Sequence, residues 1–279
     1  MRLVAIIVDF GTPDHTRSAV HSLLSSHRRP DRILVIENTP DGIGVVDGVE
    51  RVRSGRNLGF AGGANLGVRA SLAGGADALL LLNSDARVAP DCLERLESAL
   101  RPPDVGMAAP AILRDSGEVE SLGLLYDART GRMRHVQKPC RVDGLSGAAM
   151  LVKRATFERV GLLDEEYFMY FEDVDFCLRA REQGLRSVCV PEAVAHHDGA
   201  RSIGPRSPRR VYFATRNHLR LASRTLPLPA AFATVRAAGI VGLNLAHLFA
   251  RAPCPLGPGL LAVGRGTWDH MRGRYGSAE

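Results

Sequence analysis

The sequence predicts an α/β fold with a mostly parallel central sheet and helices on both faces of that sheet. Short apolar segments of strand length alternate with segments in which apolar residues recur at helical spacing. The strand segments are apolar throughout, which is typical of parallel strands covered on both sides. Polar residues directly follow three of the strands, and this pattern predicts a ligand site at one edge of the sheet.

The first elements come from the first 54 residues. Residues 3–10 and 32–38 are continuous apolar runs rich in β-branched residues, so we expect strands there, and a third strand at 49–54. Between the first two, residues 14–27 place apolar side chains at helical spacing behind polar cap residues. They predict a helix that connects two parallel strands.

The alternation continues through the next four elements. Residues 61–73 predict a helix with a glycine-rich start, and residues 77–85 predict a strand with four consecutive leucines. In residues 89–100, Pro90 suits the first turn of a helix and the leucines fall on one face. Residues 105–113 are a fifth apolar strand.

The second half of the chain is less regular. Residues 114–142 are polar and turn-rich, and their pattern predicts no particular element. The elements expected after them are a strand and short helix from residue 144, a helix within 168–184, a strand over 185–199 and an arginine-rich amphipathic helix over 208–226.

Composition and charge narrow the function classes. The chain has 279 residues, 45% of them hydrophobic, and a net charge of +6. Residues 201–225 contain seven arginines and no acid. Such a stretch favours a phosphate-bearing ligand, an anionic membrane or nucleic acid, and a merely solvated basic face is the alternative. We expect no nucleic acid partner, because no binding module is recognisable and aromatic content is only 5%.

The cysteines and the apolar segments indicate the compartment. Five cysteines without a C-x-x-C pair argue against a disulfide framework or a zinc ribbon and suit a reducing cytosol. The N-terminal apolar run is too short for a signal peptide. The most apolar later window, residues 237–249, is shorter than the roughly 18–20 residues of a membrane span. We therefore expect a cytoplasmic protein, either soluble or peripherally attached to a membrane.

Polar side chains follow three of the expected strands, namely Asp9, Glu37 with Asn38, and Asp85. A single Asp after a strand is usually a turn residue. The carboxyl ends of parallel strands meet at one edge of a sheet, where ligands bind. Three clusters at the same edge therefore favour a site over three separate turns.

The segment Asn83-Ser84-Asp85 has the spacing of an Asp-x-Asp metal motif with Asn in the first position. Asp85 offers a carboxylate and Asn83 a neutral carbonyl, and hard oxygen ligands suit a divalent metal that also binds phosphates. Either His196 or His197 could complete the set, and imidazole suits Mn²⁺ better than Mg²⁺. A hydrogen-bonded structural role is the alternative for each histidine.

Two further segments have two interpretations each. The glycine-rich residues 57–67 open a helix, where backbone amides can approach an anion, but glycines also permit close helix–sheet packing. Glu172 and Asp173 lie near a helix start, which keeps a carboxylate ionised, as a general base requires. The alternative is an acidic first turn that only stabilises the helix.

The motifs, in chain order, are VDF, IENTPDG, NLGFAGGANLG, LLNSDARV, SGAAMLVKR, YFMYFEDVDFCLRAREQG, HHDGARS and YFATRNHLR. Together they resemble those of family 2 glycosyltransferases, in the rhamnosyltransferase-like branch. The resemblance covers residues 1–225 and implies the GT-A fold, with a nucleotide-binding half at 1–113 and an acceptor and catalytic half at 114–225. Residues 226–279 would form a C-terminal helical extension.

The resemblance also implies a role for each matching position. The residues expected around the nucleotide are Asp9, Glu37, Asn38, Asn57, Gly62, Asn83, Ser84 and Arg216. Asp85 and His196 are expected at the metal, and Asp173 is expected as the general base with Glu172 beside it. Asn83 departs from the many relatives that have Asp there, which we expect to modulate metal binding.

The activity implied by the resemblance is inverting, metal-dependent sugar transfer. The sugar, rhamnose or another deoxysugar among the candidates, would pass from a dTDP-, UDP- or GDP-linked donor to an acceptor hydroxyl in cell-surface glycan or natural-product biosynthesis. A divalent metal, Mn²⁺ or Mg²⁺, would neutralise the leaving nucleoside diphosphate. A catalytically silent sugar-nucleotide-binding protein and a nucleotidyltransferase are the alternatives.

The acceptor implied by the resemblance is a small molecule or a lipid-linked molecule. In the second case, the outer arginines of the 208–226 helix would contact an anionic membrane surface. These outer arginines are Arg209, Arg210, Arg220 and Arg224. Arg216 of the same helix would contact the donor diphosphate, because a guanidinium matches phosphate oxygens.

Overall fold

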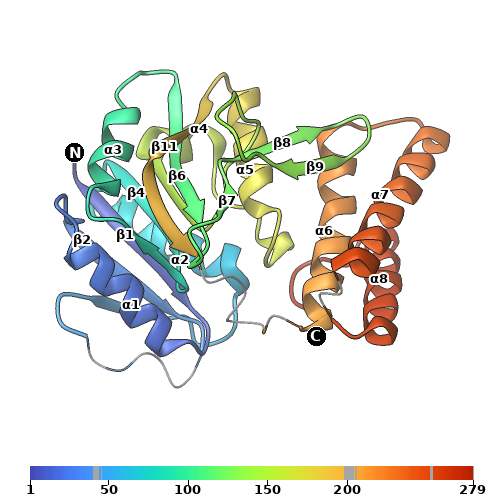
Figure 1. Ribbon diagram of the computed structural model, residues 1–279, viewed down its shortest axis with the longest axis horizontal. Helices are drawn as coiled ribbons and strands as arrows, with labels where there is room; N and C mark the ends of the chain where they lie inside the picture. Colours follow the sequence, from blue (N-terminus) through green and yellow to red (C-terminus); the bar gives the residue numbers. More distant parts are fainter. Residues whose placement is uncertain (40–43, 45, 198–203, 205, 252–253, 279) are drawn as a thin grey trace.

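The computed structural model describes residues 1–39, 44, 46–197, 204, 206–251 and 254–278. An α/β half and a helical C-terminal part lie side by side in it (Figure 1). The strands are β1 (Leu3–Asp9), β2 (Arg32–Glu37), β3 (Glu50–Arg53), β4 (Ala78–Asn83), β5 (Ala86–Val88), β6 (Val105–Leu113), β7 (Val119–Ser121), β8 (Leu124–Asp127), β9 (Arg132–His135), β10 (Ala149–Lys153) and β11 (Arg186–His197). The helices are α1 (Pro13–Leu24), α2 (Gly59–Ala73), α3 (Cys92–Ala99), α4 (Arg154–Val160), α5 (Glu172–Glu182), α6 (Pro208–Thr225), α7 (Ala230–Arg251) and α8 (Leu256–Met271), with a 3-10 turn η1 (Glu165–Tyr167).

The central sheet has the strand order β3-β2-β1-β4-β10-β6-β11-β5, and β7 pairs with the end of β6. The first four strands in this order are parallel, as are β6 and β11. β10 runs antiparallel between β4 and β6, and β5 runs antiparallel to β11. The predicted α/β fold is confirmed, and the sheet is mixed because the strand from residue 144 onward inserts in the opposite direction.

Helices cover both faces of the sheet, as predicted. On one face, α1 and α3 bury Leu23 and Leu96 against β1 side chains such as Ile7. On the other face, α2, α4 and α5 bury residues such as Val68 and Phe176. These two apolar layers hold the strands in place, so the strand ends form a rigid edge for a site.

The register of the parallel strands brings the predicted polar ends together. Asp9 at the end of β1 is the partner of Glu37 at the end of β2. On the other side of β1, Val8 is the partner of Asn83 at the end of β4. The expectation that these polar clusters share one edge of the sheet is therefore confirmed.

The segment 114–142, whose pattern predicted no element, contains three short strands. β7 extends the sheet beside β6, and β8 and β9 form an antiparallel hairpin that projects toward α6 (Figure 1). Sequence alone could not indicate them, because each has only three or four residues, too few to show a period.

The C-terminal part consists of α6, α7 and α8, which pack on one another at the end of the molecule away from β1 and β2 (Figure 1). Residues 226–279, expected to be helical, contain α7 and α8. By length and composition, α7 is the one described helix that could cross a bilayer. Only 17% of its most apolar window is buried inside the protein.

Candidate functional site

The end of β1 contributes a fully buried carboxylate. Asp9 has no exposed surface, and its Oδ1 accepts hydrogen bonds from Thr16 Oγ1 at 2.5 Å and from Thr12 Oγ1 at 3.4 Å. Thr12 also contacts the Ser84 hydroxyl at 3.1 Å, which links the ends of β1 and β4. Within the described residues, Asp9 Oδ2 has no hydrogen-bond partner. A buried carboxylate oxygen without a donor suits a ligand N–H or O–H group.

Glu37 and Asn38 lie beside Asp9 at the end of β2, and both are buried. Arg51 and Arg53 contact the two Glu37 oxygens at 3.4 Å each. The Asn38 side chain donates to the Gly59 carbonyl at 2.8 Å, so it fixes the start of α2 as well as lining the edge.

Asp85 lies in the turn between β4 and β5 and is only 6% exposed. His197 Nε2 is 3.3 Å from Asp85 Oδ1, and His197 Nδ1 is 3.3 Å from Glu120 Oε2 on β7. Burial alone would lower the pKa of His197, but the two carboxylates outweigh it and raise the pKa to about 9. A positive charge thus lies between two negative ones, and a metal cation bound at Asp85 and His197 would have to displace the proton on His197 Nε2.

The histidine beside Asp85 is His197, whereas the resemblance implied His196. His196 pairs with Arg87 across β5 and β11, and adjacent strand residues point to opposite sides of a sheet. Asn83 lies 3.4 Å from His197 through its side-chain amide, so it joins the same cluster.

Glu172 and Asp173 begin α5, and the structure gives them different surroundings. Asp173 accepts hydrogen bonds from the Gly147 N–H at 2.7 Å and from the Val174 N–H at 2.8 Å. Glu172 is buried, and within the described residues its Oε2 has no partner. Burial and the neighbouring Asp173 charge raise the pKa of Glu172 well above its usual value. Of the pair, Glu172 therefore holds a proton more readily, and Asp173 is more readily ionised.

Burial also raises the pKa of Asp173, and its backbone N–H donors oppose that shift without cancelling it. A base must be ionised, so its activity is lost as pH falls through the raised pKa. The acidic limb of the rate profile should accordingly lie above the range of an ordinary aspartate.

Two side chains connect the Asp85 cluster with the Glu172–Asp173 pair. Tyr170, in the loop before α5, is within electrostatic range of both Asp85 and Glu172. His135, at the end of β9, is within electrostatic range of Asp173 and of Glu120. The predicted metal side and the predicted base therefore face one region at the carboxyl edge of the sheet.

The glycine-rich segment packs rather than cradling an anion. Asn57 Oδ1 accepts from the Gly59 N–H at 2.9 Å, and the next two amides of α2 donate to the carbonyl of Phe168. A Cβ on Gly62 would lie 2.9 Å from Leu58 Cβ. Of the two interpretations left open, close packing is the one that the structure favours, and a nucleotide contact at Gly62 is not.

The prediction that Arg216 contacts the diphosphate is corrected by its position. Arg216 is 1% exposed, and its guanidinium donates to Asn217 Oδ1 and to the carbonyls of Tyr167 and Gly276. It also lies 5.0 Å from the centre of the Phe213 ring. These hydrogen bonds occupy the guanidinium inside the protein, and none of the partners belongs to the Asp85 cluster.

Two of the four arginines expected on the outer surface of α6 form ion pairs within the protein. Arg220 is 6% exposed and pairs with Asp164 at 2.8 Å and with Glu166. Arg224 contacts the same Asp164 at 2.9 Å. Arg201 lies outside the described residues. The acids that neutralise these arginines are on η1 and the residue before it, so a count within residues 201–225 could not include them.

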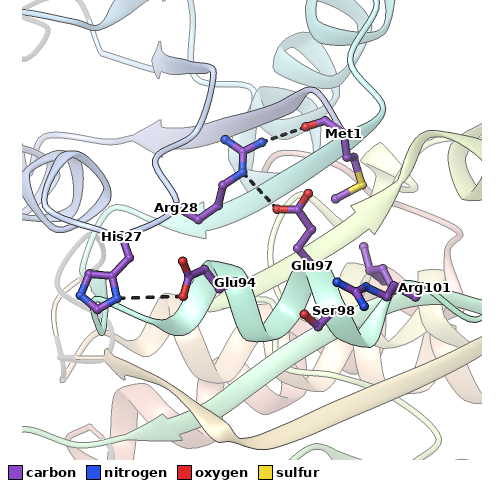
Figure 2. A pocket seen from close by; sticks show the side chains of 8 residues that line it. Met1, His27, Arg28, Glu94, Glu97, Ser98 and Arg101 are labelled. Carbon is purple, nitrogen blue, oxygen red and sulfur yellow. Dashed lines mark hydrogen bonds and ion pairs between the residues drawn. The ribbon is translucent and has the colours of Figure 1, made fainter.

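A cavity of about 420 Å³ lies at the other end of β1, beside Met1. Figure 2 shows two ion pairs in its lining: Arg28 contacts Glu97 at 3.0 Å, and His27 lies 4.0 Å from Glu94. It contains none of the predicted site residues. We do not place the active site there.

Residues 3–223 match the family described as Glycosyltransferase like family 2. The chain is a family 2 glycosyltransferase. The match covers both halves of the α/β domain and the motifs on which the predicted resemblance rested.

Two curated relatives give this glycosyltransferase its context. The low-salt glycan biosynthesis hexosyltransferase Agl10 of Haloferax volcanii is 30% identical over 194 residues, which are 64% of this chain and 62% of that protein. The N-acetylglucosaminyl-diphospho-decaprenol L-rhamnosyltransferase of Mycobacterium tuberculosis is 30% identical over 240 residues, 72% of this chain and 78% of that protein. The chain is thus similar to hexosyl- and rhamnosyltransferases.

The fold comparison agrees. The mannosyltransferase PcManGT from Pyrobaculum calidifontis, solved with GDP-Man and Mn²⁺, superposes with a TM-score of 0.59 at 15% identity. The alignment covers 98% of this chain and 83% of that one. At this identity the likeness shows the fold, and the predicted GT-A fold of the glycosyltransferase is confirmed.

Sequence reasoning missed three side chains of the site: Glu120, His135 and Tyr170. Glu120 and His135 come from the segment that predicted no element. Tyr170 precedes the acidic pair by two residues and could have been flagged from its place in YFMYFED.

Proposed function

We propose that this glycosyltransferase transfers a sugar, rhamnose or another hexose or deoxysugar, from a nucleoside diphosphate to an acceptor hydroxyl, with inversion. The observation that supports the proposal most directly is the arrangement of two sets of groups at one edge of the sheet. Asp85 and His197 form one set, and Glu172 and Asp173 form the other. A nucleotide held at Asp9 would present its diphosphate between them.

The residues divide the chemistry between them. Asp173, ionised and held by two backbone N–H groups, accepts the proton of the acceptor hydroxyl. The hydroxyl oxygen then bonds to the anomeric carbon as the bond to the diphosphate oxygen breaks on the opposite face. This single displacement inverts the configuration and needs no covalent enzyme intermediate. Protonated Glu172 adds no second negative charge beside the base.

Asp85 and His197 fit a divalent metal. They offer one oxygen and one nitrogen within 3.3 Å of each other, a donor set that suits Mn²⁺ and leaves positions for phosphate oxygens. Within the described residues there is no group of three or more His, Cys, Asp or Glu side chains arranged for a metal, and phosphate oxygens of a donor would supply further ligands. When bound, the metal would neutralise the leaving nucleoside diphosphate.

A donor panel tests the activity. Purified protein is mixed with dTDP-, UDP- and GDP-sugars, with and without Mn²⁺, and unfolding temperature and nucleoside diphosphate release are measured. A true donor at about 100 times its dissociation constant adds roughly 2.7 kcal/mol to the free energy of unfolding. Release of the nucleoside diphosphate from that donor should require an acceptor hydroxyl. Stabilisation without release on any acceptor would instead mean a silent binding protein. Conversion of a nucleoside diphosphate sugar and added pyrophosphate into a nucleoside triphosphate and a sugar phosphate would mean a nucleotidyltransferase.

We also propose that the acceptor is lipid-linked and that the enzyme meets it at the cytoplasmic face of a membrane through α7 and α8. Large apolar side chains are exposed at helical spacing on both helices, with Phe232 and Val235 on α7 and Leu261, Trp268 and Met271 on α8 each 49% exposed or more. Residues 226–279 include five arginines and two acids. An apolar stripe beside basic side chains suits an anionic lipid surface. The mycobacterial relative, named for a decaprenol-linked substrate, supports this choice.

The expected result of Leu261→Asp with Trp268→Asp is a loss of vesicle binding. Each removed side chain would contribute roughly 1.5–3 kcal/mol when buried, so affinity for phosphatidylglycerol vesicles should fall at least about 100-fold. Co-sedimentation measures it, and turnover of a short soluble acceptor should be unchanged. Arg2→Asp, a charge reversal on the far side of the sheet, is the control. If the wild type ignores anionic vesicles at low salt and is a dimer that the double variant separates, the surface is instead an interface between copies.

A further inference from the structure

The residues just before the proposed base form a strained turn, which we define as residues 166–171. Phe168, Tyr170 and Phe171 have φ of 64°, 66° and 76°. In the described part of the chain they are the only non-glycine residues with positive φ. Bulky side chains rarely adopt this conformation, and it persists only where surrounding contacts impose it. Phe171 is also the residue from which α5 starts, so the turn sets the position of Asp173.

On one side, α6 holds the carbonyl groups of the turn. Asn217 Nδ2 donates to the carbonyls of Tyr167 at 2.8 Å, Met169 at 2.7 Å and Tyr170 at 3.0 Å. The orientation of this amide follows from chemistry, because Arg216 Nε can only donate and is 3.0 Å from Asn217 Oδ1. The oxygen must face the guanidinium, and the NH₂ group must face the turn.

Arg216 holds the same backbone directly. Its Nη2 donates to the Tyr167 carbonyl at 3.2 Å, while Nη1 donates to the Gly276 carbonyl at 2.9 Å. The Gly276 N–H in turn donates to the Glu166 carbonyl at 2.8 Å. The end of the chain is thereby tied to the turn as well.

On the other side, the glycine-rich start of α2 holds Phe168. The N–H groups of Phe60 and Ala61 donate to the Phe168 carbonyl at 2.7 and 3.3 Å. The first amides of a helix favour a negative partial charge, and here a backbone carbonyl supplies it. Gly59 has φ of 70°, and a Cβ there would lie 2.3 Å from the Phe168 oxygen. Only glycine permits this approach.

We propose that Asn217, with Arg216 and the α2 N-terminus, is a positioning residue that holds the 166–171 turn so that Asp173 meets the acceptor hydroxyl. The inference rests on the proposed role of Asp173 as the base. Two sequence motifs far apart in the chain, NLGFAGGANLG and YFATRNHLR, then serve one purpose. Both motifs fix the same six residues of backbone.

Asn217→Asp is the most direct test. The variant keeps the shape and the oxygen that faces Arg216 but removes the donors to three carbonyls. We expect kcat to fall about 100-fold, the scale of a displacement of about 1 Å at a reacting group, with donor affinity unchanged. Amide hydrogen exchange should accelerate at least about tenfold at residues 166–175 and stay unchanged in β1 and β4.

A matched control and a second variant keep the test independent of folding. Gln183→Glu makes the same amide-to-carboxylate change at an exposed side chain just past the end of α5. It should leave kcat and exchange unchanged. Gly59→Ala disturbs the turn from the opposite side and should accelerate the same amides. Because both variants act on one turn, the double variant should lose less activity than the sum of the two effects predicts.

The outcomes separate the two proposals. Native exchange at residues 166–175 in Asn217→Asp, or a rise in the donor dissociation constant as large as the loss of kcat, overturns the positioning role. If exchange accelerates and kcat falls while Asp173→Asn remains active, the turn matters but the base is another residue. In that case the proposed mechanism fails and the positioning of the turn stands.

Discussion

Asp173→Asn is expected to lower turnover by at least about 100-fold, the scale of a lost general base, while the fold and donor binding are retained. The amide oxygen can still accept the Gly147 N–H, which donates to the carboxylate at 2.7 Å, so the start of α5 should stay in place. What disappears is the ability to take a proton. Initial rates at saturating donor and calorimetric titration of the donor measure the two quantities separately.

Two comparisons sharpen this prediction. Asp91→Asn changes the equivalent carboxylate at the start of α3, away from the site, and should leave kcat unchanged. Glu172→Gln should reduce turnover far less than Asp173→Asn, because burial and the Asp173 charge favour the protonated form of Glu172, which Gln resembles. The opposite ranking would make Glu172 the base. Loss of donor binding together with turnover would make Asp173 a donor ligand instead.

Asp85→Ala is expected to abolish transfer and the metal-dependent part of nucleotide binding. Asp85 is the buried carboxylate at the tip of the β4 turn, and its removal takes away one of the two carboxylates that contact His197. Without Asp85, a metal ion bound to the diphosphate would have one protein ligand fewer. Calorimetric titration with a nucleoside diphosphate, with and without Mn²⁺, gives the metal-dependent part directly.

The control for this variant lies on the same strand. Asp77→Ala removes an exposed carboxylate just before β4, at the far edge of the sheet, and should not change Mn²⁺-dependent binding. The two histidines add a second comparison: His197→Ala should weaken Mn²⁺-dependent binding at least about tenfold, and His196→Ala should not. Near-native turnover of Asp85→Ala with metal present, or the reverse ranking of the histidines, contradicts this description of the site.

The sequence by itself determined the architecture and the edge on which the site lies. Alternating strand and helix patterns need only the identities of neighbouring residues, and the ends of parallel strands must fall on one side. Asp9, Glu37 and Asp85 could therefore be placed together without coordinates. Asp173 could be proposed for a similar reason, since its place at a helix start is a local property.

Contacts between distant segments could not be deduced in this way. β11 has an irregularity between Val190 and Val194, so counting alternate residues along the strand does not tell which histidine faces Asp85. The structure decides for His197. Glu120, which contacts the other ring nitrogen of His197, belongs to β7, a strand of three residues that is too short to show an alternating pattern.

Only the tertiary structure shows which groups the arginines of α6 and the glycine-rich start of α2 contact. Residue type made anion binding one of two interpretations for both, because guanidinium groups and helix N-termini attract negative charge. In the folded chain, Arg216 and the first amides of α2 donate hydrogen bonds to backbone carbonyls of the 166–171 turn, and Arg220 forms an ion pair with Asp164. A hydrogen-bond donor group binds whichever acceptor the fold places beside it. These acceptors lie more than 40 residues away in the chain, so they come into contact only after folding.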